Sequence, residues 1–467
     1  MIRSIFYNFV AVLIVAVAAV PALAQEEEPM PILFTNVNVW DGTSENLVAA
    51  DVLVQGNLIA EVSTEPLAVA NGRIIDGGGR TLMPGLIDAH VHLLYSSTPD
   101  SIPGREAMRW DQLAVIGVVS AQEFLAEGFT TVRDAGAMYD GIKKMVDAGY
   151  IDGPRIYPSG GVISQTSGHA DWRAVSQRQP TIAGTQDNNL GRLGLMHLVD
   201  GVDEVLRATR QNLSQGATQI KLTTGGGVSS TLDPLFTKQF LHEEIEAAVR
   251  AAADWDTYVL VHAYTDETVI RSLEAGVLCI DHGQMMSAEA MQLLVEKDAF
   301  LVPNMAALSP EILDHPVYGQ GVFAVKTKAF LDGSSEFVDL VNQYKPKLVY
   351  GTDVVATDIV TSRAFRDANM WITAEAFGTL QALKAMTSTA GELMALTGQH
   401  NPYPNKLGVI EPGAYADILL IDGNPLEDIT VLGAHPTIFD AEPRDAGIET
   451  MDLIMKDGVI YKDTLEN

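Results

Sequence analysis

The sequence has little cysteine and few basic residues. It contains one cysteine, Cys279, in 467 residues, so no intramolecular disulfide can form. Cys279 lies in an apolar run over residues 276–280, which predicts a small buried core residue. Lys and Arg number 30 against 60 Asp and Glu, and the formal net charge is −30. Because such a surface repels nucleic acid and anionic lipid, we expect neither as a partner.

Long apolar runs are also scarce, apart from one at the N-terminus. Arg3 precedes an apolar stretch over residues 9–20, and small residues lead up to Ala24. The stretch is shorter than the roughly 20 residues that span a bilayer. This order is typical of a signal peptide. We predict that residues 1–24 are removed after Ala24, that the protein is exported to the periplasm or the medium, and that no stable membrane association remains; an uncleaved anchor is the alternative.

The composition, with 47% hydrophobic and 19% charged residues, is that of a globular protein. Both ends of the mature chain carry short β-type runs that are bounded by turn residues. These runs are Ile32–Trp40, Ala50–Val54, Leu58–Val62, Arg73–Leu82, Ala416–Asp422 and Leu453–Tyr461. The pattern predicts one small β-sandwich domain, formed by residues 30–83 together with residues 407–467.

Between these ends, residues 84–406 alternate short apolar runs with amphipathic stretches such as Glu243–Ala253 and Thr373–Thr397. The eight candidate strands are Gly85–His92, Thr130–Asp134, Arg155–Ser159, Gln219–Thr223, Tyr258–His262, Val277–His282, Phe300–Pro303 and Leu348–Asp353. Eight strands with intervening helices predict an α/β fold, a (β/α)8 TIM barrel, as the main domain.

The first candidate strand ends in His90-Val91-His92. Residues i and i+2 of a strand project from the same face, so the two imidazoles point to one place. Two convergent imidazoles suit a divalent metal ion. For the tripeptide alone, two ordinary histidines in a strand remain the alternative.

Other polar residues stand at the ends of later strands. Lys221 lies near the end of the fourth strand, and His262, His282 and Asp353 end the fifth, sixth and eighth. In a barrel all these ends lie on the C-terminal face, where such enzymes build their sites. Four of the ten histidines, one lysine and one aspartate are therefore expected at one mouth.

This ordered set resembles the ligand set of the metal-dependent amidohydrolase superfamily, and the flanking β-unit resembles its accessory sandwich. The superfamily's usual C-terminal run is similar to residues 408–417 here. Three further segments resemble the branch of exported Xaa-Pro dipeptidases and imidazolonepropionase-related enzymes. They are Gln219–Lys221 with its glycine-rich sequel, Ser164–His169 and Val261–Tyr264.

The resemblance implies two divalent metal ions, with zinc expected. The implied ligands are His90, His92, Lys221, His262, His282 and Asp353. A lysine ammonium cannot bind a cation, so Lys221 would be carboxylated to a carbamate that bridges both ions; a buried lysine loses its proton more readily. The alternative is a strand-end lysine whose ammonium reaches solvent.

Asp353 is the predicted proton shuttle for attack by a metal-bridging hydroxide; the alternative is that it caps the next helix. His169, in a loop after the third strand, is predicted to contact the substrate or transition state, against an exposed loop histidine. Tyr264 faces the same mouth and could donate to a carboxylate or an oxyanion; a rim tyrosine without a role is the alternative.

Seven other polar residues receive weaker predictions. Arg133 and Asp134 follow the second strand, where a structural ion pair and a substrate contact are equally open. We expect the histidines that belong to no pattern to lie on the surface: His197, His242, His315, His400 and His435.

These observations predict a binuclear hydrolase that cleaves the amide bond of a dipeptide, of the Xaa-Pro kind, or of an N-acyl amino acid. Its partner would be that small substrate, with a homo-oligomer possible. The enzymatic alternatives are a mononuclear deaminase or a cyclic-amide hydrolase of the imidazolonepropionase kind, relatives that lack the lysine at position 221. Esterase, lactonase and phosphotriesterase activities are chemically close. A non-catalytic scaffold would have lost ligands, and none is missing here.

Overall fold

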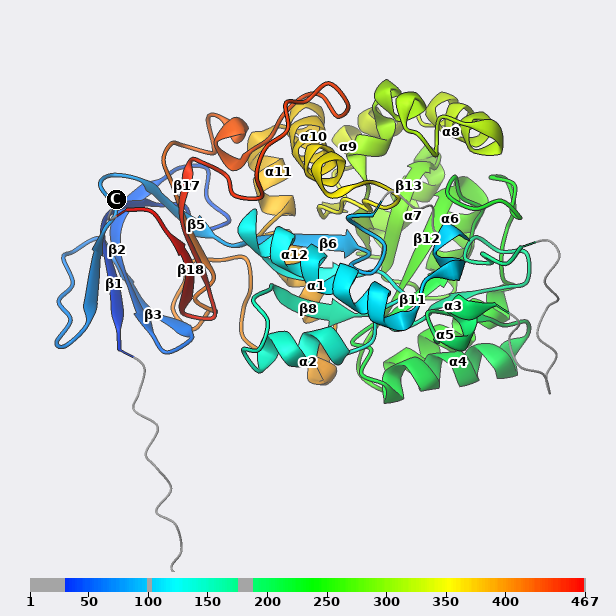
Figure 1. The fold of residues 1–467 in the computed structure, drawn as a ribbon, viewed down its shortest axis with the longest axis horizontal. Coiled ribbons are helices and arrows are strands. Elements are labelled where there is room, and N and C mark those ends of the chain that lie inside the picture. Colours follow the sequence, from blue (N-terminus) through cyan, green and yellow to red (C-terminus); the bar gives the residue numbers. More distant parts are fainter. Residues whose placement is uncertain (1–29, 99–102, 175–187, 466–467) are drawn as a thin grey trace, which may run out of the picture.

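Strands and helices alternate through the middle of the chain, as the sequence predicts (Figure 1). A computed structural model describes residues 30–98, 103–174 and 188–465. The predicted signal peptide, residues 1–24, lies outside these ranges. Within them, no helix is both long enough and apolar enough to cross a membrane.

The strands are β1 Ile32–Val39, β2 Val48–Gln55, β3 Leu58–Ser63, β4 Arg73–Asp76, β5 Thr81–Pro84, β6 Leu86–Val91, β7 Phe129–Asp134, β8 Arg155–Pro158, β9 Val162–Ser164, β10 Met196–Leu198, β11 Ile220–Thr223, β12 Val259–Thr265, β13 Cys279–Met285, β14 Phe300–Val302, β15 Lys347–Leu348, β16 Ile418–Ile421, β17 Met451–Lys456 and β18 Val459–Asp463. The helices are α1 Trp110–Ala126, α2 Gly141–Asp147, α3 Asn189–Arg192, α4 Val202–Ser214, α5 His242–Ala253, α6 Asp266–Glu274, α7 Ala288–Glu296, α8 Gly321–Gly333, α9 Phe337–Tyr344, α10 Ile359–Phe377, α11 Thr379–Ala385 and α12 Ser388–Ala395.

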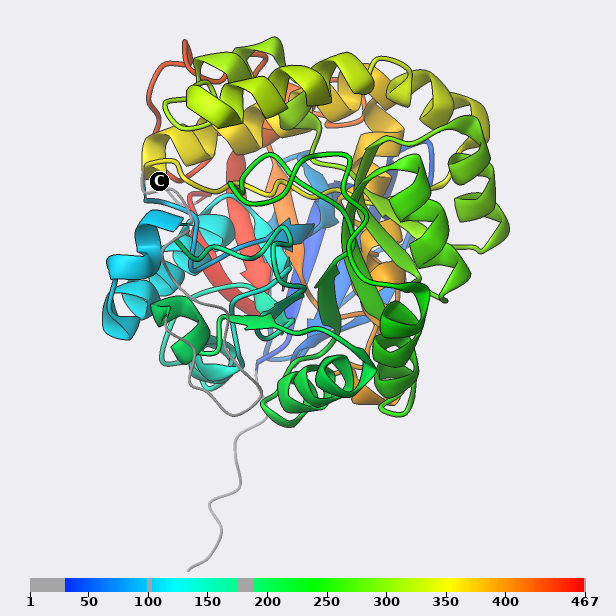
Figure 2. The same cartoon turned by 90° about the vertical axis from the view of Figure 1, so that its right-hand side faces the viewer.

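The barrel consists of two parallel sheets that close on each other. One has the order β6-β7-β8, and the other β10-β9-β11-β12-β13-β14-β15. On one side the closure is made by the Ala89 N–H, which donates to the Tyr350 carbonyl at 2.9 Å. On the other, the Thr218 N–H donates to the Pro158 carbonyl at 2.8 Å. The ring of strands with helices outside it is visible in Figure 2, and confirms the predicted TIM barrel.

Three details differ from the prediction. The predicted third strand, Arg155–Ser159, corresponds to β8, whereas β9 and the edge strand β10 were not predicted. The eighth strand is shorter than predicted and covers only β15, although its continuation still bonds to β6. The stretch Thr373–Thr397 contains the end of α10 and two more helices, because Gly378, with a φ of 88°, ends α10.

The two ends of the described chain share one eight-stranded sheet, in the order β18-β17-β16-β5-β1-β2-β3 with β4 beside β1. Figure 1 shows these strands together at one end of the barrel. They enclose a second hydrophobic core that includes Phe34, Val52, Leu82, Leu420 and Leu453. This agrees with the predicted β-sandwich; its domain limits, 30–83 and 407–467, stay a prediction. Since β5 pairs with β16 and leads into β6, the sandwich holds the start of the strand that carries His90.

A buried ion pair joins the barrel to the terminal sheet. Arg155, on β8, places Nη2 3.1 Å from an oxygen of Asp417 and 2.8 Å from one of Asp457. Its guanidinium carbon lies 3.9 Å from the ring centre of Tyr415. The side chains of Arg155 and Asp417 are only 3% and 5% exposed, so neither could be hydrated if the other were removed.

Replacing Arg155 with methionine should therefore weaken the junction strongly. The buried Asp417 carboxylate would lose its counter-charge, and we expect the free energy of unfolding to fall by roughly 3–5 kcal/mol. Urea denaturation measures this. Arg109→Met is the control, because Arg109 forms an exposed pair with Asp111 and should change stability by less than about 1 kcal/mol. Equal effects of the two substitutions would contradict the assignment.

Candidate metal and substrate site

The two histidines of the first barrel strand converge as predicted. The Nε2 atoms of His90 and His92 lie 3.3 Å apart. Each ring is oriented from behind: Nδ1 of His90 is 2.9 Å from Asp281 Oδ2, and Nδ1 of His92 is 3.1 Å from the Gly136 carbonyl oxygen. A partner on Nδ1 leaves Nε2 to face a metal ion, as is usual for metal-binding histidines.

Asp353 completes a triangle with these two nitrogens. Its Oδ1 lies 3.4 Å from Nε2 of His90 and 3.3 Å from Nε2 of His92. Ligand atoms placed 2.0–2.2 Å from a tetrahedral zinc ion are themselves about 3.4 Å apart. Desolvation by burial, followed by the charge of Lys221, lowers the pKa of His90 to about 4, which keeps its imidazole in the neutral form that binds metal. The donor set thus fits a divalent ion.

The second pair, His262 on β12 and His282 on β13, lies beside the first, with ring centres 4.4 Å apart. Nε2 of His282 is 3.9 Å from Asp353 Oδ2, and its Nδ1 is 3.1 Å from Asn304 Oδ1. Nε2 of His262 is 3.3 Å from the Gly226 carbonyl, which leaves Nδ1 as its candidate ligand atom. His90, His282 and Asp353 offer atoms that all lie within 4.8 Å of one another.

Lys221 is buried in the same cavity, 3% exposed, and its Nζ lies 3.1 Å from Asp281 Oδ2. Asp281 is a site residue that the sequence analysis missed. Its other oxygen lies 2.8 Å from Nη2 of Arg133. Although burial acts to raise the pKa of Asp281, the charges of Arg133 and then Lys221 hold it well below its ordinary value. A carboxylate within the apolar strand 277–281 was the available signal, because buried acids need partners.

Arg133 and Asp134 do not form the suggested pair with each other. Arg133 is in a structural ion pair with Asp281. Asp134 accepts hydrogen bonds from the N–H groups of Leu93 and Gly136, at 2.8 and 3.1 Å. Asp134 thereby fixes the turn after His92 and the glycine whose carbonyl orients His92.

The backbone is strained at two of these residues. His282 has a φ of 77° and Asp353 a φ of 49°, a conformation that costs a non-glycine residue of order 1–3 kcal/mol and clusters at functional sites. Gly351, before Asp353, has a different reason to be glycine. A Cβ there would lie 2.7 Å from Cβ of His90, so only glycine allows the eighth strand segment to approach the first so closely.

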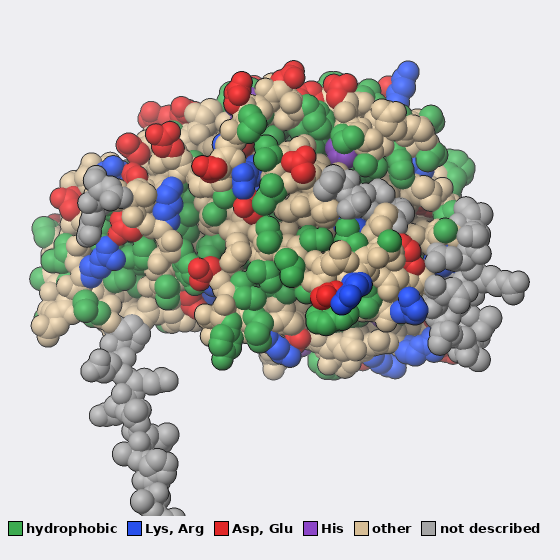
Figure 3. Space-filling model, in the orientation of Figure 1, with side chains coloured by type: hydrophobic (Ala, Val, Ile, Leu, Met, Phe, Trp, Pro, Cys, Tyr) green, Lys and Arg blue, Asp and Glu red, His purple; other side chains and the backbone are tan. Residues whose placement is uncertain are grey.

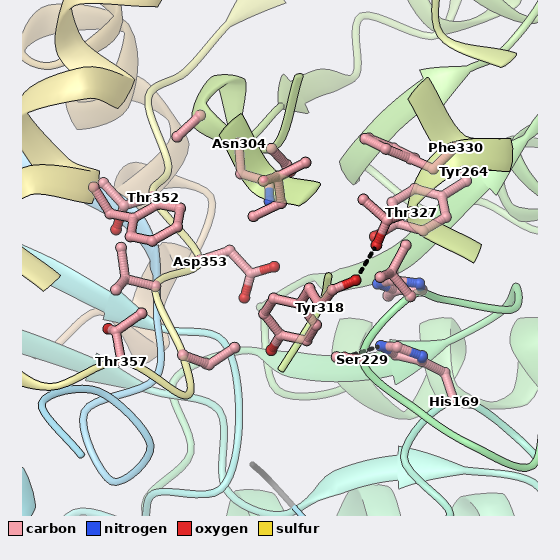
Figure 4. A pocket seen from close by; sticks show the side chains of 18 residues that line it. His169, Ser229, Tyr264, Asn304, Tyr318, Thr327, Phe330, Thr352, Asp353 and Thr357 are labelled. Atoms are coloured by element: carbon pink, nitrogen blue, oxygen red, sulfur yellow. Dashed lines mark hydrogen bonds between the residues drawn. The ribbon is translucent and has the colours of Figure 1, made fainter. Parts of the chain in front are cut away.

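A pocket opens beside the six predicted ligands and is bounded by both predicted substrate contacts, His169 and Tyr264 (Figure 4). The His169 ring stacks on that of His262, with centres 3.9 Å apart and planes 12° apart. The rest of the wall is mainly apolar, and Asp353 is the only Asp, Glu, Lys or Arg among the described residues that form it. The apolar part includes Ala306, Ala307, Ile312, Tyr318, Phe330, Val354, Val355 and Phe365.

Two histidines that were expected on the surface are buried. His197 is 8% exposed and bonds to Asn212 at 2.9 Å. His315 is fully buried among aromatic rings, including Phe365 and Phe439. His242 and His435 are exposed as expected, and His400 is half-buried. Neither buried histidine lies in a recognisable motif, so the sequence carried no signal for its tertiary partners. Cys279 is buried in the core, as predicted.

On the face in Figure 3, acidic side chains spread along the upper rim, and basic ones lie singly or in small groups. This distribution follows from the excess of acidic residues in the sequence. A continuous basic surface, which nucleic acid would require, is not visible on that face.

Comparison with known proteins now identifies the class. The model of the amidohydrolase family matches residues 81–458, and the chain belongs to this family and is an enzyme of that superfamily. Ochratoxinase from Aspergillus niger is 27% identical over 427 residues, 87% of this chain and 84% of the relative.

Two solved structures agree with this assignment. A prolidase complexed with N-methylphosphonate-L-proline is 32% identical, with a TM-score of 0.81 over 93% of this chain and 100% of that one. A Xaa-Pro dipeptidase with bound methionine in its active site is 27% identical, with a TM-score of 0.76 over 92% of this chain and 100% of that one. The predicted superfamily and branch are thus confirmed.

Replacing Asp281 with asparagine should leave a positive charge unpaired inside the barrel and destabilise the protein. Arg133, whose side chain is 0% exposed, would keep its charge without a counter-ion, and we expect the free energy of unfolding to fall by roughly 3–5 kcal/mol. Chemical denaturation of the metal-free protein measures this. Asp298→Asn is the matched control, because Asp298 is 78% exposed in its pair with Lys347, and a change below about 1 kcal/mol is expected. An Asp281 variant as stable as that control would refute this role.

Proposed function

We propose that this protein is a binuclear metal-dependent hydrolase that cleaves the amide bond of a dipeptide, of the Xaa-Pro kind, or of an N-acyl amino acid. The observation that carries the proposal is the triangle of His90 Nε2, His92 Nε2 and Asp353 Oδ1, with sides of 3.3 to 3.4 Å. Its sides match the ligand spacing of a zinc-sized ion, and more donors lie next to it.

Two ions need six donors here. In the proposal, His90, His92 and Asp353 would hold one ion, His262 and His282 would hold the other, and Lys221 would be a ligand common to both. Lys221 would become such a ligand after its amine adds carbon dioxide and releases a proton, which gives a carbamate. Its burial in the cavity that His90, His92, His262 and His282 also line supports this. The loss of the ammonium charge would release Asp281 from its contact with Lys221 Nζ, while Arg133 still neutralises that carboxylate.

The bound ions, with zinc expected, would supply Lewis acidity that activates water and polarises the amide carbonyl. Asp353 takes the proton of the attacking water and passes it to the nitrogen of the departing amine. Tyr264 donates to a carboxylate of the substrate or to the developing oxyanion. His169, at the opposite wall of the pocket from Thr352 and Thr357 (Figure 4), contacts the substrate from beside His262.

The relatives support the type of bond. They include a prolidase, a Xaa-Pro dipeptidase and an ochratoxinase. The first two names denote enzymes that cleave the bond next to a proline. The largely apolar wall around Ile312 and Phe365 supports a substrate with an apolar group. A buried lysine at position 221 favours two ions over the one ion of the deaminase and imidazolonepropionase alternatives.

The test of the proposed reaction is an assay of zinc-loaded enzyme against a library of dipeptides and N-acyl amino acids. Asp353→Asn should lower kcat by at least about a hundredfold on any substrate found, because proton transfer by a positioned group contributes roughly 10²–10⁴-fold. Residual binding of metal should persist through the histidines. A variant that retains full kcat would remove Asp353 as the proton carrier, and a library without any substrate would refute the amide assignment.

Metal analysis tests the bridged pair. The purified protein should contain close to two transition-metal ions per chain, and Lys221→Met should lower this number, because the bridge between the two ions is lost. Lys347→Met, which removes a lysine from a surface pair, should leave the metal content unchanged. Equal metal content in the Lys221 variant and the unmodified protein would exclude the carbamate, and one ion per chain in the unmodified protein would favour a mononuclear enzyme.

A further inference from the structure

The glycine-rich segment after β11 folds into a tight loop that reaches His169. The Gln239 N–H donates to the Thr224 carbonyl at 2.9 Å, and the Gly226 N–H donates to the Thr237 carbonyl at 3.1 Å. The loop is therefore closed at its base by its own backbone. Gln239 also accepts the backbone N–H of His169 at 2.8 Å, which ties the two segments together.

Inside this loop lies a carboxylate without any exposure, that of Asp233. Its Oδ2 accepts the Gly227 N–H at 2.9 Å and lies 3.4 Å from Nδ1 of His169. Its Oδ1 accepts the hydroxyl of Ser230, whose oxygen lies 2.9 Å from the same Nδ1. Because the Ser230 hydroxyl donates to Asp233, its oxygen is left to accept a hydrogen bond from the Nδ1–H of His169. The arrangement selects the tautomer of His169 that carries hydrogen on Nδ1.

A lysine from another element holds this carboxylate. Lys326 on α8 places Nζ 2.7 Å from the Gly227 carbonyl, 2.8 Å from the Ser230 carbonyl and 3.4 Å from Asp233 Oδ1. The three protons of the ammonium thus meet three acceptors. The next residues of the same helix, Thr327 and Phe330, form part of the pocket wall. Lys326 therefore fixes the His169 loop relative to that wall.

Gly227 supplies the space that His169 occupies. A Cβ at this position would lie 2.1 Å from Cε1 and 2.2 Å from Nδ1 of His169. The ring thus stacks on His262, with centres 3.9 Å apart, and lies close against the backbone of Gly227. Its Nε2 is 3.3 Å from the hydroxyl of Ser229 at the pocket wall, as the close-up shows (Figure 4).

We propose that Asp233 and Lys326 are positioning residues for substrate binding, which act by holding the His169 imidazole in one tautomer and one orientation at the pocket. This rests on the proposed function in one respect, that His169 contacts the substrate. Asp233 acts on the ring directly and through Ser230, and Lys326 acts through Asp233 and the loop carbonyls. Neither side chain is among the described residues that line the pocket.

A double-mutant cycle with the zinc-loaded enzyme tests the proposal. Asp233→Asn keeps the side-chain volume, and we expect KM to rise by about tenfold or more, the effect of losing a hydrogen bond to a charged group, with kcat changed less than about threefold. In the His169→Asn background the same change should have no further effect, because the residue through which Asp233 acts is gone. Effects that multiply would show a general structural role and overturn the proposal.

Lys326→Met and Ser230→Ala extend the cycle. The first should behave like Asp233→Asn, and the second should give a smaller rise in KM because it leaves the Lys326–Asp233 contact intact. Lys238→Met is the matched control: Lys238 lies on the same loop but is 43% exposed in a pair with Glu267, so KM should not change. Metal content of all variants should stay equal.

A measurement without turnover separates this proposal from the proposed function. Nitrogen-15 NMR of histidine-labelled holoenzyme should show hydrogen on Nδ1 of His169, identified by its loss in His169→Asn, and Asp233→Asn should mix the two tautomers. An unchanged Nδ1–H signal in the Asp233 variant would overturn the positioning role even if no substrate is found. Unchanged kcat/KM in His169→Asn would instead refute the substrate contact and with it the role in substrate binding, while the assigned tautomer of His169 would still stand.

Discussion

The polar interior of the barrel depends on the ion pairs of one buried carboxylate, that of Asp281. One of its oxygens meets Lys221 and His90, and the other meets Arg133. A lone charge at this depth would cost several kcal/mol to desolvate, and so would each cation without it. The carboxylate therefore balances the lysine and arginine and also directs Nε2 of His90 toward Asp353. The Asp281 side chain thus pairs with the buried cations of the barrel core and also orients a proposed ligand at the barrel mouth.

The sequence contained enough to predict the barrel and the positions of its polar strand ends. His90, Lys221, His262 and His282 each stand where a short apolar run stops, and parallel strands bring such ends together. The β-type runs at the two ends of the chain could be recognised equally well, because turn residues flank each of them. The prediction worked wherever a residue's role follows from its place in a periodic pattern.

It failed where the role depends on partners that are distant in the sequence. Asp281 precedes His282 by one residue, yet its partners Lys221, Arg133 and His90 come from three other strands. Asp233 and Lys326 are 93 residues apart and belong to no common motif. His197 and His315 were assigned to the surface because no pattern claimed them, whereas tertiary packing buries both. The strands β9 and β10 were not predicted because three residues are too few to show an alternating pattern.

The pairing of β5 with β16 also has a consequence for how the chain is made. The strand that carries His90 is anchored by residues such as Leu419, which lies opposite Met83 in the register, so one side of its anchor is synthesised last. Contacts of such large sequence separation are slow to form, since the loop entropy is lost before they are gained. The barrel can begin to assemble from its neighbouring strand pairs, but the first strand obtains its full support only when the C-terminal segment has been made. A nascent chain that ends before residue 418 has every proposed metal ligand but lacks β16, the strand that supports β5 on the side opposite β1.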